Sequence, residues 1–380
     1  MSAFGLYVHW PFCARKCPYC DFNSHVRVSL DEGQWLAGIV QEMNLVATLQ
    51  GNDRPRLTSI FFGGGTPSLM AGASVARIID EAAKLWTPEP DIEITIEANP
   101  ASAEAARFAD YAAAGVNRLS LGVQSLRDAS LKFLGRLHDV AEAKAALKLG
   151  LAAFPRLSFD LIYTLPGQTA EDWRTELTEA LSLGSEHLSL YQLTIEPITP
   201  FATMVKRGKL IMPPDETSVA LYELTQDITA AAGLPAYEVS NHARPGAESR
   251  HNLVYWRYAA YAGVGPGAHG RLDLYGGRYA TAGERLPERW HEKIGQKGHG
   301  YATIVPVPKE EGAREHLLMN LRLTEGLDLD AYQARWGHGP SPAKIAELTD
   351  LGLIALSAGR LKATAQGMLL LNRLIEELAD

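Results

Sequence analysis

Short apolar runs alternate with longer amphipathic, alanine-rich stretches over the first two thirds of the chain. Short apolar runs predict strands, whereas apolar positions that recur every three or four residues predict helices. The predicted strands are residues 4–10, 57–62, 92–97, 118–123, 157–163, 187–194 and 236–240. The predicted helices between them include residues 31–50, 74–86, 103–114, 140–149 and 170–183. This alternation predicts an α/β protein in which a parallel sheet, covered by helices, forms a partial, TIM-like (β/α) barrel.

Five of the loops that follow the predicted strands have unusual compositions, rich in glycine, proline and polar residues. They are residues 11–13, 63–67, 97–100, 124–125 and 165–167. In βα barrels the carboxyl ends of the strands form the active face. We therefore expect these five loops to converge on one site.

The alternation stops near residue 270, where the larger domain, residues 1–270, is expected to end. A stretch rich in glycine, arginine and tyrosine follows, and residues 271–309 are expected to form a linker. The remaining pattern predicts helices at 311–323, 328–336, 342–351 and 364–378 and short strands at 353–355 and 360–363. Helices followed by a small β wing predict a compact, winged-helix-like domain over residues 310–380.

Composition narrows the possible functions of the chain. Its 380 residues are 46% hydrophobic and 21% charged, as in an ordinary globular protein. The net charge of −8 argues against a general nucleic-acid surface, so no nucleic-acid partner is expected. No apolar run approaches the about 18 residues of a membrane span, and the first thirty residues do not resemble a signal peptide. We therefore expect a cytoplasmic protein.

All three cysteines of the chain lie within eight residues of one another, at Cys13, Cys17 and Cys20. They are too few and too clustered for a disulfide framework, and such clusters in a cytosolic chain are more often metal ligands. Their spacing suits an iron-sulfur cluster, which normally takes four thiolates, so one iron would find another ligand or stay open. A zinc site completed by His9 or His25 remains the alternative.

The cysteine segment resembles a known signature. Residues 7–13, Tyr-Val-His-Trp-Pro-Phe-Cys, followed by Cys17 and Cys20, are similar to the radical-SAM motif of the oxygen-independent coproporphyrinogen III oxidases and the related HemW-type heme chaperones. The resemblance extends over almost the whole chain. It implies a 4Fe-4S cluster on the three cysteines, whose open iron binds the amino and carboxylate groups of S-adenosylmethionine (SAM). One electron from the reduced cluster then cleaves SAM to a deoxyadenosyl radical.

The same resemblance implies a set of SAM-binding positions in this chain. Glycines allow the backbone to approach the ligand, Glu97 suits a ribose hydroxyl or a cationic centre, and Arg136 suits the SAM carboxylate. Taken singly, each of these residues also fits a purely structural role, as a turn, a solvated side chain or a core aromatic. The implied positions are Tyr7, Tyr19, Gly64, Gly65, Thr66, Glu97, Gln124, Arg136, Asp160 and His269.

Two departures favour the heme chaperones over the oxidases. The oxidase signature has a fourth cysteine where this chain has Phe22, and the oxidases have a longer N-terminal extension, whereas this chain begins twelve residues before Cys13. The segment 251–256, His-Asn-Leu-Val-Tyr-Trp, matches a motif of the chaperone group. His251 is able to ligate heme iron, and Tyr255 and Trp256 are able to stack on a porphyrin. A buried aromatic cluster is the structural alternative.

The sequence therefore predicts a heme-binding chaperone that uses its cluster and SAM to control heme transfer or oligomerisation. The resemblance implies respiratory cytochromes in the membrane as heme acceptors, approached peripherally from the cytoplasm. Whether the protein is also an enzyme stays open. A coproporphyrinogen III oxidase is the alternative, and Arg244, Arg250 and Arg257 would pair with porphyrin propionates in either case. A zinc-stabilised structural or DNA-binding protein, the third hypothesis, fits neither the acidic balance nor the loop motifs.

Overall fold

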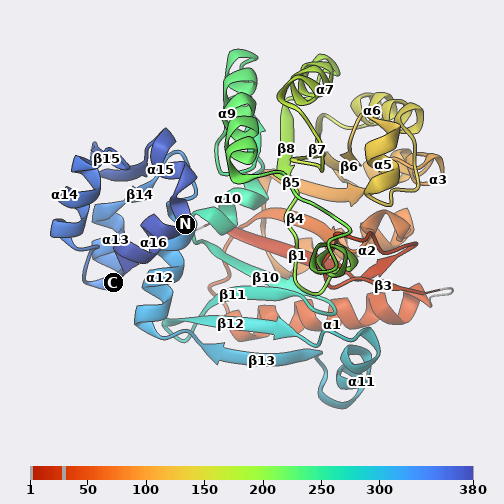
Figure 1. Cartoon of the computed structure of the whole chain (residues 1–380). Helices are drawn as coiled ribbons and strands as arrows, with labels where there is room; N and C mark the ends of the chain where they lie inside the picture. The colour runs from red at the N-terminus through yellow and green to blue at the C-terminus, as the bar shows by residue number, and fades with distance from the viewer. Residues whose placement is uncertain (1–2, 28–30, 380) are drawn as a thin grey trace.

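Seven parallel strands form the centre of an 11-stranded sheet (Figure 1). The computed structural model describes residues 3–27 and 31–379. The strand order is β13-β12-β11-β10-β1-β4-β5-β6-β7-β8-β9, and every pair from β10 to β8 is parallel. The parallel strands are β1 (Phe4–Trp10), β4 (Leu57–Gly64), β5 (Pro88–Ala98), β6 (Arg118–Gln124), β7 (Arg156–Tyr163), β8 (His187–Gln192) and β10 (Ala260–Val264). The predicted α/β partial barrel is confirmed.

Helices cover the outer face of the sheet. Side-chain caps fix several of their starts: Asp31 caps α1, and Asp139 and Thr169 form capping boxes at α6 and α7. The predicted helix over 103–114 is broken into α3 and α4 near Arg107, whose guanidinium donates to the carbonyls of Ser68 and Leu69. The helices of this part of the chain are α1 (Glu32–Gln50), α2 (Gly72–Leu85), α3 (Ser102–Ala105), α4 (Phe108–Ala113), α5 (Asp128–Phe133), α6 (Val140–Ala153), α7 (Ala170–Ser182), α8 (Pro200–Lys206), α9 (Asp215–Ala231), α10 (Arg250–Trp256) and α11 (Pro287–Lys297), with a 3-10 turn at Pro67–Leu69.

Alternation along the strands separates an apolar face from a polar one. In β5, Ile94 and Ile96 belong to the hydrophobic core beneath the helices. Glu93 and Glu97 alternate with them and therefore face the interior of the barrel. Polar residues at such positions give this barrel a polar interior, which holds the site described below.

Two segments differ from the expectations. The strand predicted at 236–240 is wrong, and β9 lies at Asn241–Ala243 instead, because the buried Glu238 carboxylate accepts from Ser240 N at 3.1 Å and Asn241 Nδ2 at 2.5 Å and turns the chain.

Residues 271–309, expected to form a linker, extend the sheet with antiparallel strands and contain α11. The turn between β11 and β12 has positive φ at Tyr275 (52°) and Gly276 (77°), which is the geometry of a tight β-hairpin. The strands of this hairpin were not predicted, because the segment is rich in glycine and polar residues. The proposed division into domains stays a prediction. The added strands are β11 (His269–Leu274), β12 (Gly277–Gly283) and β13 (Tyr301–Pro306), and a separate parallel pair consists of β2 (Phe12–Cys13) and β3 (His25–Val26).

The C-terminal helices and a three-stranded sheet enclose a second hydrophobic core (blue in Figure 1). Leu317, Leu361 and Leu374 are among its buried members. Among the described residues, no helix is long and apolar enough to cross a membrane. The elements are α12 (Lys309–Asn320), β14 (Leu327–Asp328), α13 (Leu329–Trp336), α14 (Pro342–Asp350), β15 (Ile354–Ser357), β16 (Arg360–Ala363), α15 (Ala365–Leu369) and α16 (Leu371–Ala379).

Candidate functional site

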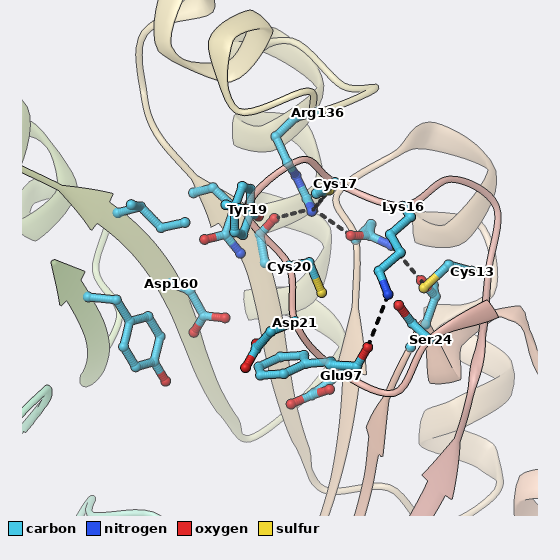
Figure 2. A pocket seen from close by; sticks show the side chains of 18 of the residues that line it. Cys13, Lys16, Cys17, Tyr19, Cys20, Asp21, Ser24, Glu97, Arg136 and Asp160 are labelled. Carbon is cyan, nitrogen blue, oxygen red and sulfur yellow. Dashed lines mark hydrogen bonds between the residues drawn. The ribbon is translucent and has the colours of Figure 1, made fainter. Parts of the chain in front are cut away.

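A cavity of about 460 Å³ opens at the carboxyl ends of the parallel strands. Four of the five loops expected to converge contribute to its wall, and residues 165–167 do not. The end of β8, Tyr191 and Gln192, and the residues after it, Leu193, Thr194 and Glu196, complete it on that side. Figure 2 shows the cysteine loop on one side of the cavity and Glu97 and Asp160 facing it. The predicted site residues that line it are Cys13, Cys17, Tyr19, Cys20, Gly64, Gly65, Thr66, Glu97, Gln124, Arg136 and Asp160.

The three cysteines lie on one loop at the edge of the cavity. All are free, and Cys20 N donates to Cys17 O at 3.2 Å, which closes the turn between them. Thr66 Oγ1 donates to Cys13 Sγ at 3.4 Å and Arg136 donates to Cys17 Sγ at 3.5 Å. Burial raises the pKa of the Cys13 and Cys20 thiols, so a bound cation is needed to keep them ionised. Three thiols on one cavity wall, with donors aimed at two of the sulfurs, fit a cubane cluster.

The zinc alternative finds no support in the two histidines. His9 Nδ1 is paired with Tyr7 Oη at 2.8 Å and His9 Nε2 with Asn23 O at 3.0 Å. His25 Nε2 lies 3.2 Å from Arg285 O. In the described parts of the chain, no three His, Cys, Asp or Glu side chains are grouped to hold a single metal ion. A cubane is larger than one ion, so its ligands lie further apart.

Asn99 forms hydrogen bonds with both residues that donate to cysteine sulfurs. The sequence motifs did not identify it. Asn99 Oδ1 accepts from Arg136 at 2.5 Å, and Asn99 Nδ2 donates to Thr66 Oγ1 at 3.3 Å. The carboxylate of Glu104, which is buried and also accepts from Ser68, accepts from Asn99 N at 2.9 Å. The only sequence signal was its place in the strand-end loop 97–100.

Gly64 and Gly65 present only backbone atoms to the cavity wall. Gly64 has φ of +112° and its amide donates to Glu97 Oε2 at 3.2 Å. A Cβ on Gly65 would lie 2.7 Å from Phe12 O, so only glycine fits against the cysteine segment. Gln124, at the end of β6, also has positive φ (73°), which is unusual for a residue with a side chain. Such backbone conformations are common at binding sites.

Two carboxyl groups face the cavity with raised pKa values. Burial, and then the negative charge of Asp160, raises the pKa of Glu97 to about 8. Burial raises the pKa of Asp160 to about 6, against the opposing effects of Ser189 and the guanidinium groups of Arg118 and Arg136. A cationic ligand would lower both values. Binding of a cation there would therefore be accompanied by proton release near neutral pH.

Two residues implied as SAM ligands do not line the cavity. Tyr7 lies deeper in the barrel, paired with His9 and stacked near Phe61 at 6.3 Å between ring centroids. His269 is exposed at the start of β11. Their roles in binding stay predictions.

The residues expected to contact heme lie outside the cavity, where α10 packs against β1 and β4. His251 is buried, and its Nδ1 and Nε2 pair with Ser59 Oγ at 2.8 Å and Tyr255 Oη at 2.7 Å. Burial, aided by the charge of Arg118, lowers the pKa of His251 to about 3. A neutral imidazole with both nitrogens paired is unable to ligate iron without breaking one of these bonds.

A buried ionic cluster holds the start of α10 at this end. Glu93 accepts from Arg156 at 2.6 Å and from the backbone amides of Arg250 and His251 at 3.1 Å each. Arg118 Nε lies 3.9 Å from the same carboxylate. These groups close the amino end of the barrel.

Trp256 and two of the three arginine candidates are also engaged, whereas Arg244 is exposed. Trp256 packs beside the cluster of Tyr237 and Leu323. Arg250 forms an ion pair of 2.6 Å with Asp91, and Arg257 forms one of 2.8 Å with Glu325.

Comparisons with known proteins cover nearly the whole chain. Residues 7–179 match the family described as "Radical SAM superfamily" and residues 307–370 match the "HemN C-terminal domain". The chain is 37% identical to the heme chaperone HemW of Escherichia coli over 98% of this chain and 97% of that protein. It is 38% identical to "Radical S-adenosyl methionine domain-containing protein 1, mitochondrial" of Mus musculus, over 98% and 86% of the two chains. The coproporphyrinogen III oxidase (HemN) of Escherichia coli has a similar fold, with a TM-score of 0.82 over 100% of this chain and 90% of that one, at 22% identity.

Proposed function

The chain belongs to the radical SAM family that includes the heme chaperone HemW, and we propose that it binds heme and hands it to an acceptor protein. The observation that carries this proposal is the full-length similarity to HemW of several bacteria, at 35–37% identity. Phe22 supports it, because the oxidase signature has a fourth cysteine at this position. Phe22 lines the cavity and is 62% exposed.

Membership in the radical SAM superfamily implies a 4Fe-4S cluster and SAM. When bound, these groups supply one-electron chemistry at the cavity. We propose that Cys13, Cys17 and Cys20 hold the cluster. Gly64 and Gly65 would bring the backbone close to the SAM amino group, and Arg136 would approach its carboxylate.

Further residues would complete the SAM site. Glu97 and Asp160 would accept from hydroxyl or amino groups and release protons as the ligand binds. Gln124, Thr66 and Tyr19 would position it. The thiols, guanidinium and carboxyl groups named here face one cavity, which suits a ligand that carries both positive and negative charges.

We propose that the protein acts in the cytoplasm and delivers heme to membrane-bound respiratory cytochromes from the membrane surface. In this proposal the cluster and SAM regulate heme transfer. An oxidase activity is the alternative hypothesis, and the fold similarity to HemN is common to both functions.

One preparation tests both functions. Reconstituted, reduced protein with verified iron and sulfide content is titrated anaerobically with heme, and a Soret shift with one heme bound is expected. The same protein is incubated with SAM and coproporphyrinogen III, and mass spectrometry is expected to show no decarboxylated product. A product that loses two carboxyl groups, and disappears in Cys17→Ala, would establish the oxidase instead.

A further inference from the structure

Large apolar side chains are exposed both at the cavity and on the segment that follows β8. Phe22 and Tyr191 line the cavity and are 62% and 41% exposed. Ile198 and Ile211, on the segment that follows β8, are 75% and 79% exposed. Exposed large apolar groups near a binding cavity are typical of a surface that another apolar body covers.

The segment from residue 193 to residue 214, which we call the rim segment, is also cationic. It contains Lys206, Arg207 and Lys209 against one acidic residue, Glu196, so its net charge is +2 in a chain of net charge −8. All three cations are exposed, and none forms an ion pair with another described residue.

Packing holds the rim segment against the cysteine loop. Phe201 N donates to Pro18 O at 3.1 Å, and the Phe201 ring lies 4.9 Å from the ring of Phe133 and 6.4 Å from that of Tyr19. Leu193, Thr194 and Glu196 of the same segment line the cavity itself. The rim segment therefore adjoins the candidate cluster site.

The cavity is too small to enclose a macrocycle in addition to the implied groups. At about 460 Å³ it lies at the low end of the roughly 300–1,000 Å³ typical for one drug-sized ligand. With a cluster and SAM inside it, the cavity leaves no room for a porphyrin, which would have to bind outside it.

We propose that heme binds on the rim segment of this protein. This proposal rests on the proposed function. The apolar macrocycle lies over Ile198, Ile211 and Phe22, and the two propionates pair with two of the cations at 206, 207 and 209. Heme has a flat, apolar macrocycle and two anionic propionates, so it is complementary to an apolar surface with adjacent cations.

An anionic membrane is the competing occupant. The observations favour heme because α8 has only seven residues, far shorter than the amphipathic helices that usually lie on bilayers, and because the surface adjoins the cavity. Membrane binding is therefore treated as an outcome of the test.

The test uses two rim variants of the full-length, reconstituted protein. One replaces Ile198 and Ile211 by serine, and the other replaces the cations at 206, 207 and 209 by glutamine. All five side chains are exposed, so the variants are expected to fold and to keep the iron and sulfide content of the parent. The matched controls are Leu351→Ser with Leu356→Ser, and Arg77→Gln with Lys148→Gln and Lys297→Gln, which are exposed elsewhere.

We expect each rim variant to bind heme at least about tenfold more weakly in Soret titrations, and the controls to bind like the parent, since losing one charge-assisted pair costs about 1.4 kcal/mol or more. Parent-like heme affinity in both rim variants would overturn the proposed heme surface and leave the proposed function intact. Binding to phosphatidylglycerol vesicles that is lost in the rim variants, with heme affinity unchanged, would reassign the surface to the membrane. A parent protein that binds no heme would overturn the heme surface and the proposed function together.

Discussion

The two candidate motifs, at opposite ends of the barrel, differ in how completely their polar groups are paired. At the amino end, both nitrogens of His251 are hydrogen-bonded and the Glu93 carboxylate has four nitrogen or oxygen donors. At the carboxyl end, none of the three cysteines is in a disulfide, and Arg136 Nε is buried without a hydrogen-bond partner among the described residues. Polar groups that the protein does not satisfy are groups that a ligand can satisfy.

This difference favours a ligand-binding role for the cysteine motif and a structural role for the segment 251–256. The segment 251–256 attracts attention in the sequence because histidine and aromatic residues are frequent heme contacts. In the structure its histidine serves the closed end, where it ties α10 to β4 through Ser59. The predictions below test this assignment, from the largest expected effect to the smallest.

The cysteine loop provides the most drastic test of the open end. The chain has only three cysteines, so Cys17→Ala leaves two thiolates and no substitute. We expect the iron and sulfide content to fall to near zero, while the far-UV circular dichroism spectrum stays that of the parent. Tyr255→Phe, at the closed end, is expected to keep the full content. Parent-like iron and sulfide in Cys17→Ala would refute the proposed ligand set.

The ionic cluster provides the corresponding test of the closed end. In Glu93→Gln the buried Arg118 loses its carboxylate and Arg156 loses its 2.6 Å partner. Breaking a buried pair on one side typically costs about 3–5 kcal/mol, so urea unfolding should show a loss of this order. The control is Glu89→Gln, whose pair with Arg56 is partly exposed and is expected to contribute about 1 kcal/mol or less. Equal losses in the two variants would show that the cluster has no special role.

The sequence was sufficient to predict the parallel barrel, since buried strands and amphipathic helices leave strong periodic signals. It also predicted that the strand-end loops converge, because parallel strands end on one face. Two features of the structure were not predicted from the sequence. The hairpin of β11 and β12 has no apolar alternation strong enough to stand out, and the pairing of His251 with Ser59 joins residues 192 positions apart in the chain. Residue type indicates what a histidine is able to do, and only the tertiary fold determines whether its nitrogens are free.

His251 itself separates the two interpretations of its motif. His251→Phe preserves a planar ring against Phe61 but leaves the hydroxyls of Ser59 and Tyr255 without their partner. Buried unsatisfied groups cost about 1–3 kcal/mol each, so we expect lower stability in urea. Heme affinity, measured by Soret titration, should be unchanged within about twofold, since His251 is buried at the amino end of the barrel and the proposed heme surface lies at the carboxyl end. A loss of heme binding in a folded His251→Phe protein would favour the heme-contact interpretation.

Glu97 predicts a pH dependence at the open end. Its pKa of about 8 in the free protein means that a cationic ligand, which favours the ionised carboxylate, has to displace a proton below that pH. The affinity for SAM should therefore rise with pH, by up to about tenfold per unit, and level off above about pH 8. Calorimetry in buffers of different ionisation enthalpy should detect the released proton. Glu97→Gln should flatten this slope, and an unchanged slope would assign the proton to another group.

Asn99 tests the finest feature of the open end, the support behind the sulfur ligands. It joins Thr66 and Arg136, whose donors point at Cys13 and Cys17, and hydrogen bonds to cluster sulfurs favour the reduced, more negative state. In Asn99→Ala both donors lose their anchor, so the midpoint potential should become slightly more negative in a titration followed by electron paramagnetic resonance. Asn117→Ala removes comparable hydrogen bonds to Ile92 and Ile94 away from the cavity and should change stability without changing the potential. If both variants shift the potential equally, general loosening of the barrel is the cause, and Asn99 has no positioning role. If only Asn99→Ala shifts it, the open end is organised one layer beyond the residues that its sequence motifs identify.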